Sequence, residues 1–334
     1  MKLFPTKKSR ILLVFIGFIL LSMMMLFLLQ NHRYKIHLLF QDDRYKESYG
    51  YLLYRCLTKD TEAALGIFRP VDFRADFFGL VYEGNSQNLL DKQVLCFGAQ
   101  EKYILFFMRD VTNVLEKNEV VFVDIGANVG QHSLFMSIFA KEVHAFEPYP
   151  PVLEKFRKLV AINNINNIYI HPVGLSNENG QLPFSEPPDS DTGTGSFSHN
   201  ESNLSLPLVI GDEWLEKIGT TRVDIIKCDI EGYEKLALLG LRHTLEKYRP
   251  IIIMELNVGL EESFQSIDDF YATFPNDYEV LFFCKEDPYT GKYNLCKYSD
   301  GLNFKKRERY NIIVYPTEKK RFIMKAYQHN QNAG

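Results

Sequence analysis

The sequence is poor in the residues that mark small disulfide-bonded or nucleic-acid-binding proteins. It has only five cysteines and one tryptophan in 334 residues, without a CxxC pair or a Cys/His cluster of metal-binding spacing. It has no excess of positive charge either, since the formal net charge of −4 provides no general field for nucleic acid. No internal repeat is visible. With 46% hydrophobic residues, the composition excludes a disordered chain and is typical of a globular protein with a sizeable core.

One long hydrophobic run lies near the N-terminus. Residues 11–29 carry no charged side chain and would span about 28 Å as a helix, close to the thickness of the bilayer core. No Ala-x-Ala cleavage pattern follows, so we predict an uncleaved single-pass anchor within residues 1–35 and a membrane location. The basic flanks favour a cytoplasmic N-terminus only slightly, and the side of the membrane that holds the rest of the chain stays open.

The cysteines allow two interpretations. Cys284 and Cys296 could face each other across a hairpin and form a disulfide outside the cytoplasm. The odd number of cysteines and the position of Cys228 inside a hydrophobic run favour unpaired thiols.

The chain after the anchor divides into three parts. We interpret residues 36–118 as a cap with strands at 77–85 and 94–97 and a helix at 101–116. Residues 119–318 form the main domain. Residues 319–334 are expected to be a basic tail, and the basic cluster before it, which includes Arg309, to be a solvated surface.

From residue 120 onwards, short hydrophobic runs alternate with helical patterns. The predicted strands are residues 120–123, 143–146, 168–170, 223–228, 251–254, 278–283 and 311–315. Strands buried on both faces and alternating with helices predict an α/β protein with a mostly parallel sheet. No convincing helix separates the last two strands, which can therefore pair antiparallel. Seven strands with this ending predict a Rossmann-like methyltransferase sheet with helices on both faces.

A glycine-containing turn follows the first of these strands. Asp124 ends the strand, and Gly126 and Gly130 let the backbone turn tightly beside a ligand. Asn128 occupies the place of the second glycine of a dinucleotide motif, which argues against a pyrophosphate site. Glu147 ends the next strand about 20 residues further on, where an acidic side chain can accept hydrogen bonds from both ribose hydroxyls of an adenosine.

A second acidic motif follows the fourth strand. Asp229 ends the strand, and either Asp229 or Glu231 can serve as the base that removes a proton, although Glu231 can equally cap the next helix. His132 and His199 are weaker candidates. His199 lies in an insertion, residues 185–205, that can close over the site as a lid or remain a surface loop.

The same strand ends allow a metal site. Oxygen ligands that suit Mg²⁺ follow two neighbouring strands at Asp229, Glu231, Glu255 and Asn257. Carboxylates at strand ends also occur without a metal, so Mg²⁺ is possible here but not favoured.

Four sequence blocks in a fixed order resemble the FkbM family of methyltransferases. Spread over about residues 100–256, they read VFVDIGANVGQHS, VHAFEPYPPVLEKFRKLVAINN, IYIHPVGLSNENGQLPF and VDIIKCDIEGYEKLALLG. The resemblance implies the class I fold, S-adenosylmethionine as cofactor and methylation of a hydroxyl on a sugar or a polyketide-type product. It also implies a DxEG signature at residues 229–232. The cofactor-binding residues that it implies are Glu101, Asp124, Gly126, Asn128, Gly130 and Glu147.

These observations lead to one hypothesis and two alternatives. We expect a membrane-anchored methyltransferase that O-methylates a sugar, a glycan or a lipid-linked saccharide, with no nucleic-acid partner. An NAD(P)-dependent oxidoreductase could use the same glycine turn, but the spacing of that turn argues against it. A non-catalytic, membrane-anchored interaction module is the other alternative, and the presence of Asp124, Glu147 and Asp229 argues against it.

Overall fold

The computed structural model describes residues 71–115, 119–197, 202–257, 263–297 and 309–332. The predicted anchor at residues 11–29, most of the first half of the predicted cap, and His199 lie outside these ranges. Within them, no helix combines the length and the hydrophobicity that a membrane crossing requires.

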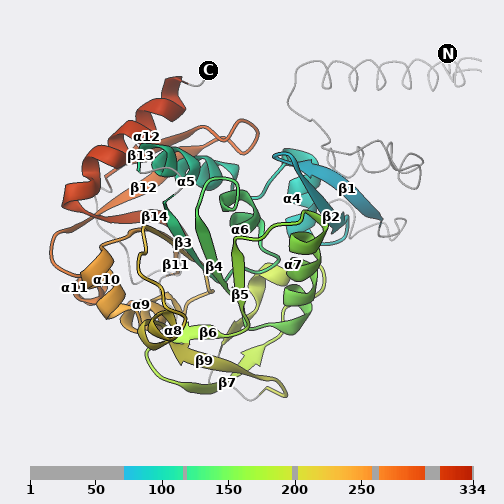
Figure 1. Cartoon of the computed structure of the whole chain (residues 1–334), viewed down its shortest axis with the longest axis horizontal. Helices are drawn as coiled ribbons and strands as arrows, with labels where there is room; N and C mark the ends of the chain where they lie inside the picture. Colours follow the sequence, from blue (N-terminus) through green and yellow to red (C-terminus); the bar gives the residue numbers. More distant parts are fainter. Residues whose placement is uncertain (1–70, 116–118, 198–201, 258–262, 298–308, 333–334) are drawn as a thin grey trace, which may run out of the picture.

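The centre of the molecule is a mixed eight-stranded sheet with helices on both faces (Figure 1). The strands along the sheet are β13 (Tyr293–Cys296), β12 (Tyr278–Glu286), β14 (Arg309–Pro316), β11 (Ile251–Asn257), β10 (Ile225–Cys228), β3 (Val121–Ile125), β4 (Glu142–Phe146) and β5 (Ile168–His171). The five strands from β11 to β5 are parallel, whereas β14, β12 and β13 are antiparallel to their neighbours.

The prediction of a seven-stranded, mostly parallel sheet is therefore corrected in two respects. β13 is an additional strand, and three of the eight strands lie in an antiparallel edge. β13 escaped prediction because it has only four residues and pairs with β12 alone. The antiparallel ending itself agrees with the missing helix between the last two predicted strands.

The sheet separates two hydrophobic cores, because its buried strands contribute alternate side chains to each face. One core contains Phe122 and Ile253, and the other contains Val123 and Ile252. The helices on the first face are α5 (Lys102–Val114), α6 (Gln131–Met136), α7 (Pro150–Ile162) and α12 (Lys320–Asn332). Those on the second face are α8 (Gly211–Lys217), α9 (Glu234–Leu239), α10 (Arg242–Tyr248) and α11 (Ile267–Thr273).

The cap begins with the antiparallel hairpin of β1 (Asp72–Phe77) and β2 (Leu80–Asn85), followed by α4 (Leu89–Phe97). The strand predicted at residues 94–97 is wrong, since these residues form the last turn of α4. Asn88 caps the start of this helix with its side chain, and Gly98 ends it at a φ of 84°. Four consecutive hydrophobic residues did not distinguish the buried face of a helix from a strand.

The segment after β5 forms a small second sheet, which Figure 1 shows below the main one. Its strands, in spatial order, are β6 (Gly174–Ser176), β9 (Ser205–Ile210), β7 (Gly180–Ser185) and β8 (Ser196–Phe197). The single helix predicted at residues 234–245 is broken into α9 and α10 at Gly240. A Cβ at this position would lie 1.9 Å from the backbone oxygen of Ser176, so the backbone of β6 approaches the helix break closely.

The C-terminal residues expected as a basic tail contain α12, which packs against α5. Ile323 and Ala326 on this helix are fully buried in the first core. Among the described cysteines, Cys228, Cys284 and Cys296 are free, so the hairpin disulfide does not form. Cys96 is disulfide-bonded, which corrects the expectation that the thiols are all unpaired.

Candidate active site

A cavity of about 230 Å³ opens where the parallel strands end. Its floor comes from residues at or just after the carboxyl ends of β3, β4, β10 and β11, and its walls come from α4, the second sheet and the start of β14. In open α/β sheets, ligands bind beyond the carboxyl ends of the strands. Of the predicted site residues, the cavity lining includes Glu101, Gly126, Asn128, His132, Glu147, Asp229, Glu231 and Glu255.

The glycine turn after β3 depends on two close contacts. Gly126 has a φ of 81°, and a Cβ there would lie 2.0 Å from the backbone oxygen of Asp229. Gly130 has a φ of 83° and packs against the ring of Phe156 in the same way. Asp124 lies beneath the turn, fully buried, and accepts a hydrogen bond of 2.6 Å from Ser133. Asp124 and Gly130 therefore build the turn, whereas Gly126 also lines the cavity.

Glu147 is the acidic residue of the next strand end. Its two carboxylate oxygens each accept one backbone hydrogen bond, from Asn128 at 2.9 Å and from Tyr149 at 2.8 Å. Burial raises the pKa of Glu147 to about 7, against the effect of these two donors. Because an ionised carboxylate oxygen can accept more than one hydrogen bond, each oxygen can accept another one from a ligand in the cavity.

Sequence analysis missed Lys227, a buried cation between the site carboxylates. It is 3% exposed, and its ammonium group lies 2.8 Å from Asp229. Burial opposes its charge, but Asp229, Glu101 and Asp124 outweigh burial and raise the pKa of Lys227. A lysine inside an otherwise hydrophobic strand was the available signal, because such a residue needs partners of opposite charge.

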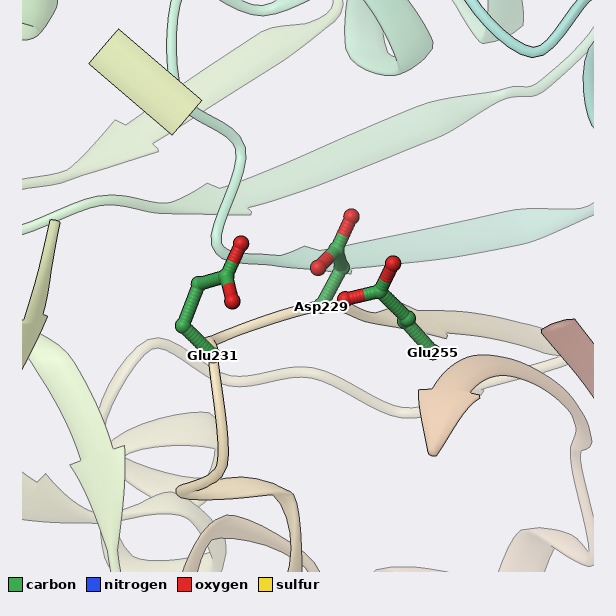
Figure 2. Close-up of side chains that lie close together, drawn as sticks. All are labelled: Asp229, Glu231 and Glu255. Atoms are coloured by element: carbon green, nitrogen blue, oxygen red, sulfur yellow. The ribbon is translucent and has the colours of Figure 1, made fainter. Parts of the chain in front are cut away.

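Three carboxylates gather at the carboxyl ends of β10 and β11, with Glu255 among the last residues of β11 itself. Figure 2 shows Asp229, Glu231 and Glu255 beside one another, and one oxygen of each lies within 4.8 Å of the others. Glu231 does not cap the next helix, since α9 begins at Glu234, whose side chain accepts a hydrogen bond from the backbone of Gly232 at 3.0 Å. Burial and the two neighbouring carboxylates raise the pKa of Glu231 to about 7.

A guanidinium group neutralises part of this cluster. Arg309, expected on a solvated surface, lies 2.8 Å from Glu231 and 3.7 Å from Glu255. Asn257 donates a hydrogen bond of 3.0 Å to Glu255 from its amide nitrogen. The donor set is of the oxygen-rich kind that Mg²⁺ accepts, but Arg309 already supplies a positive charge to two of the three carboxylates.

Glu101 and His132 lie side by side in the cavity lining, close to this cluster. Glu101 precedes α5 in a left-handed conformation, with a φ of 45°, and accepts a hydrogen bond of 3.0 Å from Asn311. Its other carboxylate oxygen lies 3.6 Å from Nε2 of His132. Burial and the charge of Lys227 lower the pKa of His132 well below its usual value, so its imidazole is neutral.

Part of the predicted insertion covers the cavity. Residues 191–197 line it, and the backbone oxygen of Thr192 accepts a hydrogen bond of 2.7 Å from the side chain of Asn128. Leu89 at the start of α4 donates a backbone hydrogen bond of 2.8 Å to Ser190. The insertion is therefore bonded both to the glycine turn and to the cap.

Comparison with known proteins agrees with this arrangement. Residues 124–280 match the model of the methyltransferase FkbM domain. The chain is 29% identical over 148 residues to hexuronic acid methyltransferase AglP of Haloferax volcanii, covering 44% of this chain and 59% of that protein. It is 26% identical over 161 residues to 2-O-methyltransferase NoeI of Sinorhizobium fredii, covering 42% of this chain and 65% of that protein. The chain thus spans less than two thirds of each relative.

Solved structures include distant neighbours. A methyltransferase FkbM from Methylobacillus flagellatus has 17% sequence identity and a TM-score of 0.39, over 59% of this chain and 44% of that one. An O-methyltransferase from Bacillus cereus, in complex with S-adenosylhomocysteine, has 11% identity and a TM-score of 0.35, over 64% of this chain and 80% of that one.

The mixed sheet, the glycine turn and the acidic strand ends define an α/β protein of the methyltransferase type. The match over residues 124–280 specifies the family, and the resemblance of the four sequence blocks is confirmed. Residues 124–280 correspond to the methyltransferase FkbM domain.

Proposed function

We propose that this protein is an S-adenosylmethionine-dependent O-methyltransferase. The observation that carries the proposal is Glu147, whose two oxygens keep hydrogen-bonding capacity at the cavity beside the glycine turn. This arrangement fits the two ribose hydroxyls of an adenosine. When bound, S-adenosylmethionine supplies a methyl group that its sulfonium centre activates for transfer.

The chain's own residues have three tasks in this proposal. Glu147 and the backbone around Asn128 hold the adenosine and orient it. The carboxylates of Asp229, Glu231 and Glu255 outnumber the cations beside them, so this end of the cavity suits a positively charged group. The part of the insertion that lines the cavity, residues 191–197, excludes water and aligns an acceptor hydroxyl with the methyl group.

The acceptor is proposed as a hydroxyl of a sugar, a glycan or a lipid-linked saccharide. The names of the two relatives, a hexuronic acid methyltransferase and a 2-O-methyltransferase, support this class. The apolar run at residues 11–29 supports a single-pass anchor and an acceptor near a membrane. Removal of residues 1–30 should then reduce product formation in cells. Unchanged product in cells would contradict the membrane-proximal acceptor.

The test of the class is calorimetric titration of the detergent-solubilised chain with S-adenosylhomocysteine, NAD and NADP, repeated on the Glu147→Ala variant. We expect micromolar binding of S-adenosylhomocysteine alone, lost in the variant. Binding of NAD or NADP instead would indicate an oxidoreductase. A folded chain that binds none of the three would indicate a non-catalytic module.

A further inference from the structure

One carboxylate of the cavity has no task in the binding of the adenosine described above. The side chain of Glu101 is 16% exposed, and Asn311 donates a hydrogen bond of 3.0 Å to one of its oxygens. The amide of Asn311 also donates to the hydroxyl of Tyr103 at 2.7 Å, so Asn311 is itself held in place. The other oxygen, Oε2, is buried and accepts no hydrogen bond. Nε2 of His132 lies 3.6 Å from it, beyond hydrogen-bond distance, and is also buried without a partner.

This free oxygen distinguishes Glu101 from the other carboxylates that line the described cavity. Lys227 pairs with Asp229, Arg309 pairs with Glu231, and backbone amides bond both oxygens of Glu147. Among these lining residues, only Glu101 has a buried oxygen without a hydrogen-bond partner. A buried acceptor without a donor costs about 1–3 kcal/mol, so its presence in a cavity points to a donor that arrives with a ligand.

The backbone of Glu101 is also held in an unusual conformation. Its φ of 45° lies in the left-handed region, which costs a residue with a side chain about 1–2 kcal/mol. Glu101 stands at the start of α5, whose buried residues belong to the first core. The helix and Asn311 therefore fix the carboxylate at the cavity wall.

We propose that Glu101 is the general base of the methyl transfer, which assigns it to the acceptor rather than to the cofactor. This inference rests on the proposed function. The acceptor hydroxyl donates its hydrogen bond to Oε2 of Glu101. As the acceptor oxygen forms its bond to the methyl carbon, its proton passes to Oε2 and the electron pair of the carbon–sulfur bond stays on sulfur. Glu101 then releases the proton to solvent.

The charges around Glu101 agree with its assignment as the general base. Burial raises the pKa of Glu101 to about 7, and Asp229 and Glu255 add to this effect while Lys227 opposes it. A base with a pKa near the working pH is both ionised and able to take a proton. The titratable or charged groups that face Glu101 are Lys227, Asp229, Glu255, His132 and Tyr103.

The experiment compares Glu101→Gln with Glu231→Gln in the full chain, with Glu246→Gln as the matched control. Glu246 lies on the exposed face of α10 and, within the described residues, forms an ion pair with Arg242 at 3.4 Å and no other. We expect Glu101→Gln to lower kcat about 10²–10⁴-fold while the Kd of S-adenosylhomocysteine changes less than about threefold. The rise of kcat toward a plateau above about pH 7 should disappear in Glu101→Gln and persist in Glu231→Gln.

The possible results separate this inference from the proposed function. Loss of S-adenosylhomocysteine binding in Glu101→Gln would make Glu101 a cofactor residue and overturn the inference, while the methyltransferase assignment stands. A retained pH limb in Glu101→Gln, or its loss in Glu231→Gln instead, would also overturn it. If the unsubstituted chain fails to bind S-adenosylhomocysteine, the proposed function itself fails.

Discussion

The affinity for the adenosine ligand should depend on pH through Glu147. Its pKa of about 7 means that the carboxyl is mostly protonated in the free protein at pH 6 and mostly ionised at pH 8. Only the ionised form offers both oxygens to ribose hydroxyls while it accepts the amides of Asn128 and Tyr149. Binding therefore favours the ionised form, and affinity should rise with pH.

The expected size follows from the titration. The ionised fraction is about one tenth at one pH unit below the pKa and about nine tenths at one unit above it. The Kd of S-adenosylhomocysteine should therefore fall about tenfold between pH 6 and pH 8, equivalent to about 1.4 kcal/mol. Calorimetry at a series of pH values measures this change directly.

Two variants identify the group responsible. Glu147→Gln should bind about 10–100-fold more weakly at pH 8, because charge-assisted hydrogen bonds are lost, and most of the rise in affinity between pH 6 and pH 8 should disappear. Glu101→Gln should keep the pH dependence, although Glu101 has a similarly raised pKa. A Kd that is constant from pH 6 to pH 8 in the unsubstituted protein, while circular dichroism reports a folded chain, would refute this reasoning.

Three further predictions concern the metal, the fold and its acid stability. Because Arg309 already pairs with Glu231, activity should survive removal of divalent cations by EDTA, and a loss restored by Mg²⁺ would contradict this. Gly126→Ala should lower the free energy of unfolding by at least about 2 kcal/mol in urea denaturation, since both its φ and its contact forbid a Cβ. Gly219→Ala, with a φ of 75° and no atom within 4 Å, should cost only about 1 kcal/mol. Burial and the neighbouring His144 lower the pKa of His171 to about 4 from 6.5, so its stability contribution is complete above pH 6.5. Up to about 3 kcal/mol should be lost as the pH falls from 6.5 to 4, and His171→Gln should flatten this dependence.

The regular part of the fold could be predicted because burial imposes a pattern on the sequence. Strands β11, β10 and β3 lie side by side in the middle of the eight-stranded sheet. Each is therefore a short, largely hydrophobic run with a polar residue at or just after its end. In the second sheet, β6 and β8 have only three and two residues, and β7 and β9 contain exposed residues, so their sequences carry no comparable pattern. β13 was missed for the same reason.

The site could be predicted where its residues follow consecutive parallel strands. The topology brings such positions to one edge of the sheet, which is how the sequence alone associated Asp229 with Glu255. It could not reveal the partners that reach this edge from elsewhere. Arg309 joins Glu231 across 78 residues, and Asn311 joins Glu101 across 210. These contacts depend on how β14 and the cap pack, which no local pattern encodes.

The position of these cavity residues relative to the family match also matters for the choice of acceptor. The family match covers residues 124–280, whereas Glu101, Leu89 and Arg309 line the same cavity from outside that range. The side of the cavity proposed to bind the adenosine, with the glycine turn and Glu147, lies inside the matched range. The walls that remain to contact an acceptor are therefore built in part by segments outside the family match. Acceptor candidates should accordingly be chosen by their fit to these walls, and a screen should include neutral, acidic and amino sugars rather than hexuronic acids alone.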